Sequence, residues 1–117
     1  MARRLADESR FLGPARICGR LYRIYTPDSF AYPGLVPDET GAPLIGDLLA
    51  LTDPAATLDW LDTYEEAGPA FPEPQEYRRV LLPVTTDKET RRAWVYIYCW
   101  QVEETMQISS GDWLSRA

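Results

Sequence analysis

The segment "EYRRVLLPVTTDKETRRAWVYIYCW", residues 76–100, decides the fold class. Two runs rich in aliphatic, β-branched and aromatic residues flank "TTDKET", a polar stretch with the composition of a turn. In the second run, smaller residues alternate with tryptophan and tyrosine. The pattern predicts a β-hairpin with strands near residues 77–85 and 92–101. Because both faces of the second strand carry bulky side chains, we expect it to be covered on both sides.

A helix is predicted shortly before this hairpin, in "TDPAATLDWLDTYEEAG", residues 52–68. Asp53 is a favourable N-cap, and Pro54 suits the first position of the helix. Gly68 and the proline after it stop the helix. We therefore expect the helix to run from Pro54 to Glu66.

Glu65 is the unusual residue of this helix. At 100° per residue it lies about 340° from Leu58, with Leu61 at about 300°, so it falls within the apolar arc. A carboxylate on the core-facing side must be hydrogen-bonded, paired or neutral, because an isolated buried charge is costly. Two interpretations remain open: a structural ion pair with an arginine, or a functional carboxylate with a raised pKa. The candidate ion-pair partners are Arg20, Arg78 and Arg79.

The first half of the chain adds two strand candidates, near residues 15–25 and 44–51. Between them, residues 26–43 are punctuated by proline and glycine and are predicted to form one long loop, a length more typical of a functional or mobile segment than of a simple connection. The first ten residues suggest a short helix or a tail. The chain of 117 residues suits a single α+β domain with a mostly antiparallel sheet.

Composition restricts the possible partners and chemistry. A net charge of −6 argues against nucleic acid, since that affinity comes from neutralising phosphates. No apolar run approaches the roughly 20 residues of a membrane span, and no secretory signal is recognisable, so we expect a cytoplasmic protein without a membrane partner. Cys18 and Cys99 are interpreted as reduced thiols. The chain has no histidine, so acid–base chemistry would rest on carboxylates, tyrosine or lysine.

Four motifs, in this order, resemble the gamma-glutamylcyclotransferase-like family: "FLGPARICGRLY", "YPGL", "LIGDLLAL" followed by "LDTYE", and "EYRRVLLPV" followed by "AWVYIY". The resemblance covers roughly residues 10–98, and "SSGDW" near the end is similar to the tail of bacterial members. It implies a small mixed, mostly antiparallel barrel or strongly curved sheet with flanking helices.

The resemblance also implies a reaction and a site. Active relatives cyclise a gamma-glutamyl amine or amino acid to 5-oxoproline and release the amine, with a glutamate in the pattern L-D-x-x-E-G as general acid/base. Glu65 matches that glutamate, whereas Glu66 replaces the usual glycine. The implied substrate-binding residues are Tyr22, Tyr32, Pro33 and Gly34, with core or loop packing as the alternative for the tyrosines. The reaction needs no metal or organic cofactor, which fits a chain without histidine or a phosphate-binding glycine loop.

One departure from the family concerns the start of the chain. Family members begin with a strand and turn resembling Y-G-T-L-R, and no such segment precedes Phe11. We therefore expect the single domain of residues 1–117 to be short of its N-terminal strand. Either a homodimer forms through the sheet edge left open, or an open groove remains beside Glu65. The alternatives are a non-catalytic relative acting as a small-molecule-binding or assembly module, and an unrelated β-rich interaction domain.

Overall fold

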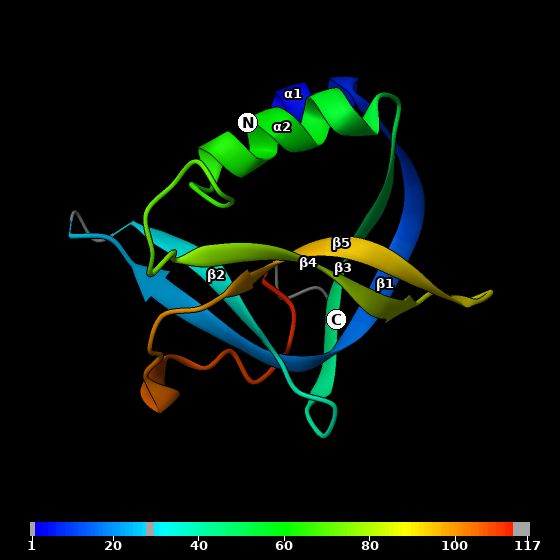
Figure 1. Cartoon of the computed structure of the whole chain (residues 1–117). Helices are drawn as coiled ribbons and strands as arrows, with labels where there is room; N and C mark the ends of the chain where they lie inside the picture. Colours follow the sequence, from blue (N-terminus) through cyan, green and yellow to red (C-terminus); the bar gives the residue numbers. More distant parts are fainter. Residues whose placement is uncertain (1, 28–29, 114–117) are drawn as a thin grey trace.

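The computed structural model describes residues 2–27 and 30–113 of the chain. Its elements are, in order, α1 (Ala2–Asp7), β1 (Ser9–Tyr25), β2 (Ala31–Pro37), β3 (Ala42–Leu51), α2 (Pro54–Tyr64), β4 (Tyr77–Thr85), β5 (Thr90–Tyr98) and the 3-10 helix η1 (Glu104–Met106). The strands form one antiparallel, curved and unclosed sheet, and α1 and α2 lie together across its open side (Figure 1). This confirms the predicted α+β class with a strongly curved sheet and flanking helices. Within the described ranges, no helix has the length and apolar character needed to cross a membrane.

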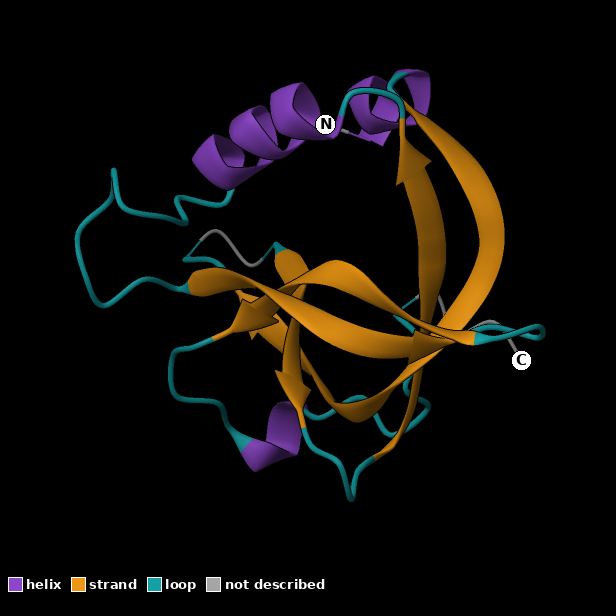
Figure 2. Ribbon diagram, turned by 45° about the vertical axis from the view of Figure 1, so that its right-hand side comes forward, coloured by secondary structure: helices purple, strands orange, loops and turns teal. Residues whose placement is uncertain are grey.

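The sheet is organised around β1, which is longer than the sequence predicts. Its second half pairs with β2 and its first half pairs with β3. Arg16 pairs with Ile45 of β3 and with Thr85 of β4, so β3 and β4 occupy opposite edges of β1. A bulge between Phe11 and Gly13 interrupts the register near its start, and Gly13 adopts a φ of 122° that suits glycine. Figure 2 shows β1 and β3 curving away together from the rest of the sheet toward the helices.

The prediction of one continuous loop over residues 26–43 is wrong, because β2 lies inside it. Two prolines, Pro33 and Pro37, made this segment resemble a loop. Proline is tolerated in an edge strand, where its missing N–H does not interrupt a second ladder. β2 is the outermost strand of the order β2-β1-β4-β5, so its prolines are compatible with pairing to β1.

The β4–β5 hairpin is confirmed, with pairing from Tyr77–Tyr98 to Thr85–Thr90. The expectation that β5 is covered on both sides is wrong. β5 is the last strand of the order, and Trp94 remains 49% exposed. The sheet does not close over β5, and the Arg79 guanidinium, 4.3 Å from the Trp94 ring centroid, shields only part of that ring.

Hydrogen bonds to Glu8 hold helix α2 against the junction of α1 and β1. The hydroxyl of Thr57, which is fully buried, donates to Glu8 Oε1 at 2.6 Å. The indole N–H of Trp60 donates to the same oxygen at 2.9 Å. The buried apolar side chains of the core come from the strands and from the segment after α2: Leu21, Tyr22, Leu44, Ala67, Tyr77, Val84 and Tyr98. Cys18 and Cys99 are free thiols, and both are exposed.

Candidate active site

Glu65 lies at the point where α2 ends, and the helix is two residues shorter than predicted. The last helical residue is Tyr64, and Glu65 is the C-cap, with its N–H donating to the Leu61 carbonyl at 2.9 Å. The chain then turns through Glu66, whose φ is 53°. The N–H of Glu66 donates to the Thr63 carbonyl at 3.1 Å, and the next N–H, of Ala67, donates to that of Asp62 at 2.9 Å. These two bonds make a Schellman motif.

The side chain of Glu65 is half-buried and has no ion pair within residues 2–27 and 30–113. Burial raises the pKa of its carboxyl above the ordinary value, and the negative charge of Glu76 raises it further. The direction of this shift agrees with the functional interpretation of Glu65. The alternative, a structural ion pair between Glu65 and an arginine, is contradicted.

The structural ion pair exists three residues earlier, at Asp62. The Arg79 guanidinium contacts both carboxylate oxygens of Asp62, with Nε–Oδ1 at 2.8 Å and Nη2–Oδ2 at 3.0 Å. The Tyr96 hydroxyl donates to Oδ1 at 2.5 Å. Burial alone would raise the pKa of Asp62, but the hydrogen bonds from Arg79 and Tyr96 outweigh it and lower that pKa. Asp62 therefore attaches α2 to β4 and β5, which fixes the end of the helix that carries Glu65.

Three tyrosines, one each from β2, β4 and β5, lie close together, and the negative charge of Glu65 contributes to the raised pKa of two of them. Tyr32 of β2 donates its hydroxyl proton to Glu76 Oε2. The Tyr77 ring lies 6.3 Å from that of Tyr32 and 5.4 Å from that of Tyr98, measured between centroids. Burial is the main cause of the raised pKa values of Tyr32 and Tyr77, and the charges of Glu76 and Glu65 add to it. Tyr32 therefore belongs to the same electrostatic cluster as Glu65.

Glu76, Tyr77 and Tyr98 are members of this cluster that the sequence did not predict, and Glu76 is the charged one among them. Glu76 precedes β4 directly, and nothing in its local pattern distinguishes it from a solvated glutamate at a strand end. The one clue in the sequence is that Glu76 comes directly after the loop that follows Glu65.

Pro33 and Gly34 contribute through the backbone. The Pro33 carbonyl accepts a hydrogen bond from the Tyr77 hydroxyl at 2.7 Å, which links β2 to β4. Gly34 is buried, and a Cβ there would lie 3.0 Å from Ile24 Cγ1 and from Tyr98 Cγ. Its missing side chain makes room for the Tyr98 ring.

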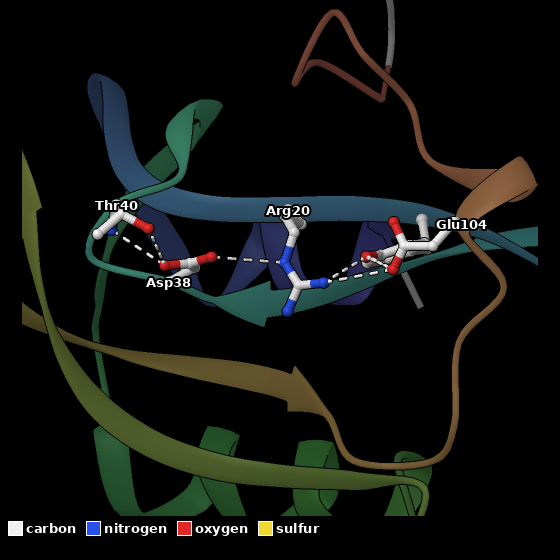
Figure 3. A network of polar contacts seen from close by, with 5 residues as sticks. Arg20, Asp38, Thr40 and Glu104 are labelled. Carbon is white, nitrogen blue, oxygen red and sulfur yellow. Dashed lines mark hydrogen bonds and ion pairs between the residues drawn. The ribbon is translucent and has the colours of Figure 1, made fainter.

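The Tyr22 hydroxyl belongs to a different polar group. Tyr22 is fully buried, and its oxygen accepts from Arg20 Nη1 at 2.8 Å and donates to Glu104 Oε1 at 3.2 Å. Figure 3 shows Arg20 lying between Asp38 and Glu104, each at 3.6 Å in an ion pair. These contacts connect β1 to the turn after β2 and to η1.

A cavity of about 520 Å³ lies beside the end of α2, under the loop of residues 68–75. Its lining residues include Asp62, Ala67, Arg78, Arg79 and Trp94, and Glu65 is not among them. Across residues 2–27 and 30–113, no three His, Cys, Asp or Glu side chains are grouped so that they could hold a metal ion.

The sequence profile of a family described as "Gamma-glutamyl cyclotransferase, AIG2-like" matches residues 1–115. The chain belongs to this family. No curated protein and no solved structure gives a significant match. Membership in the gamma-glutamyl cyclotransferase, AIG2-like family agrees with the resemblance of the four motifs.

Proposed function

We propose that the protein is a gamma-glutamylcyclotransferase that converts a small gamma-glutamyl amine or amino acid to 5-oxoproline, with Glu65 as general acid/base. The observation that carries this proposal is the half-buried carboxyl of Glu65 in a chain of the gamma-glutamyl cyclotransferase family, with its raised pKa and with no ion-pair partner among the described residues. A carboxylate kept only for structure would be expected to have a partner such as the one Asp62 has.

The reaction is intramolecular in the substrate. Glu65 takes a proton from the α-ammonium group, and the freed nitrogen attacks the γ-carbonyl carbon to form the ring C–N bond. The tetrahedral intermediate collapses with cleavage of the original amide C–N bond. Glu65 gives this proton to the leaving nitrogen and then removes the second proton of the ring nitrogen, which the released amine accepts. One substrate thus gives 5-oxoproline and one protonated amine, and the carboxylate is regenerated. Holding the amine near the carbonyl can supply several kcal/mol, on the order of 7–11 in the best-oriented cases.

The raised pKa of Glu65 suits this double role. A carboxyl of ordinary acidity holds its proton too weakly near neutral pH to donate efficiently to an amine nitrogen. Burial of Glu65 brings the two protonation states closer in free energy at working pH. Tyr32, at the edge of the same cluster, supplies a phenol for contacts with the glutamyl group, and Pro33 and Gly34 shape the backbone beside it. The Tyr22 hydroxyl instead connects Arg20 of β1 to Glu104 of η1.

The test is release of 5-oxoproline from a panel of gamma-glutamyl amines and amino acids, followed by mass spectrometry. Glu65→Gln should lower kcat by about a hundred-fold or more, because an amide keeps the shape but cannot transfer the proton. Glu66→Gln is the matched control, since it removes the same charge one residue later, and it should leave the rate close to wild type. Release that persists in Glu65→Gln would exclude Glu65 from the mechanism. A panel without any turnover would favour the non-catalytic, binding or assembly role.

One observation favours an assembly role beside catalysis. Within the described residues, β4 pairs with β1 only at Arg16–Thr85, so the edge of β4 from Tyr77 to Val84 has no strand partner. Such edges attract further strands. We propose a homodimer in which a second copy covers this edge. Light scattering over a range of concentrations should give twice the 13.3 kDa of one chain, and a monomer at all concentrations would overturn the dimer.

A further inference from the structure

The loop between α2 and β4 is closed at its base by one side chain, Gln75. The Gly68 N–H donates to Gln75 Oε1 at 2.9 Å, and Gln75 Nε2 donates to the Gly68 carbonyl at 2.7 Å. Gln75 Nε2 also donates to the Phe71 carbonyl at 3.0 Å. The two ends of the loop are thereby held side by side. Glu76, the residue after Gln75, is returned to the end of the helix that carries Glu65.

Two contacts then fix Glu76 itself. Its carbonyl accepts from the N–H of Cys99 at 2.7 Å, which anchors its backbone beside the end of β5. Its carboxylate accepts the Tyr32 hydroxyl proton. Residues of β2 and of the segment after β5 thus hold Glu76 in place, more than a solvated glutamate at a strand end requires.

The groups that face Glu65 are acidic or phenolic. Glu76 acts on it from the start of β4, and the charge of Glu65 is in turn felt by Tyr32 of β2, Tyr77 of β4 and Tyr96 of β5. The nearby cation on β4, Arg79, is paired with Asp62 and does not act on Glu65. Glu76 is therefore the charged group that bears on the protonation of Glu65.

We propose that Glu76 is a positioning residue for Glu65: its carboxylate, held by the Tyr32 hydroxyl at the closed base of the loop after α2, places a negative charge beside Glu65. This inference rests on the acid/base role proposed above for Glu65. During cyclisation the proton passes from the substrate ammonium to Glu65 and then to the leaving nitrogen. Glu76 keeps its charge throughout and touches neither reacting atom. Its effect is to make the proton-donating form of Glu65 accessible closer to neutral pH.

The first test needs no turnover. In protein labelled with glutamate carrying a ¹³C carboxyl, the resonance of Glu65 is the one that disappears in Glu65→Gln, and its titration midpoint can be followed by NMR. The midpoint should move to lower pH in Glu76→Gln, in which the amide oxygen still accepts from Tyr32 but the charge is gone. Glu76→Asp keeps the charge and should stay close to wild type. Glu39→Gln is the matched control, because Glu39 is an exposed glutamate in the turn between β2 and β3.

The second test uses the reaction. The acid limb of the kcat/KM profile should move to lower pH in Glu76→Gln, and kcat should fall by about ten-fold or more, the size of effect usual for residues that tune a catalytic group. Circular dichroism of each variant checks that the fold is retained. An unchanged Glu65 midpoint in folded Glu76→Gln would overturn the inference. If wild type releases no 5-oxoproline, the proposed function fails, and the NMR midpoint still decides the coupling of Glu76 to Glu65.

Discussion

Replacing Glu66 with glycine should stabilise the protein, because Glu66 occupies a backbone conformation that suits glycine. Its φ of 53° lies in the left-handed region, at the turn that closes the Schellman motif of α2. A Cβ in that region costs about 1–2 kcal/mol. Glycine gives back about 0.5–1 kcal/mol through the greater freedom of the unfolded chain. The net gain in the free energy of unfolding is therefore about 1 kcal/mol, or about 4 °C in the midpoint of thermal unfolding.

The assay is urea and thermal unfolding of wild type, Glu66→Gly and Glu66→Ala. The alanine variant is the matched control, because it removes the carboxylate but keeps the Cβ. It measures the separate gain from removing a negative charge at the C-terminal end of a helix, about 0.3–1 kcal/mol. The difference between the glycine and alanine variants isolates the backbone contribution. Equal stability of the two variants would refute the argument that the left-handed turn at Glu66 is strained.

Three further changes test the packing and charges of the same region. Gly34→Ala should destabilise the fold by about 1–3 kcal/mol, because the added Cβ would lie only 3.0 Å from side chains of β1 and β5. Gly46→Ala is the control, because a Cβ there would meet no atom within 4 Å. Equal losses of stability in urea unfolding of the two variants would contradict this explanation. Asp62→Asn should lower the free energy of unfolding by about 1–3 kcal/mol at neutral pH, and this loss should shrink as the pH drops through the lowered pKa of Asp62. Asp59→Asn, on the exposed side of α2, should lower it little. A loss that is the same at every pH would exclude the ion pair as its cause. Glu65→Gln should be more stable than wild type at neutral pH. Folding raises the pKa of Glu65, so the ionised carboxylate opposes folding at pH values above the pKa that Glu65 has in the unfolded chain. A gain in stability that persists at acidic pH would argue against this origin.

The local elements were predictable because their signals lie within a few neighbouring residues. The hairpin of β4 and β5 follows from alternating residues on either side of a polar turn, and the start of α2 follows from Asp53 and Pro54. The Asp53 carboxylate accepts from the Ala56 N–H at 3.2 Å, as expected of an N-cap. β2 escaped prediction because its prolines suppress the local strand signal. Only its position at the edge of the sheet makes those prolines acceptable.

Glu65 was recognisable because helical periodicity alone places a carboxylate on the apolar side of α2. Its surroundings were not predictable. Three arginines were equally plausible partners in the sequence, and the fold pairs Arg79 with Asp62 instead. Glu76 gave no local signal, because its hydrogen-bond donor, Tyr32, is distant in the chain.

Periodicity and capping over short distances are enough to predict the fold class, the start and approximate end of α2, the β4–β5 hairpin and the unusual glutamate. Which charges meet depends on the folded chain. Among the described residues, Glu65 has no arginine partner, the charge of Glu76 raises its pKa, and Arg79 pairs with Asp62. The physical reason is that pairing and desolvation depend on distances between strands and loops far apart in sequence. Those distances are fixed only when the curved sheet and the closed loop after α2 have formed.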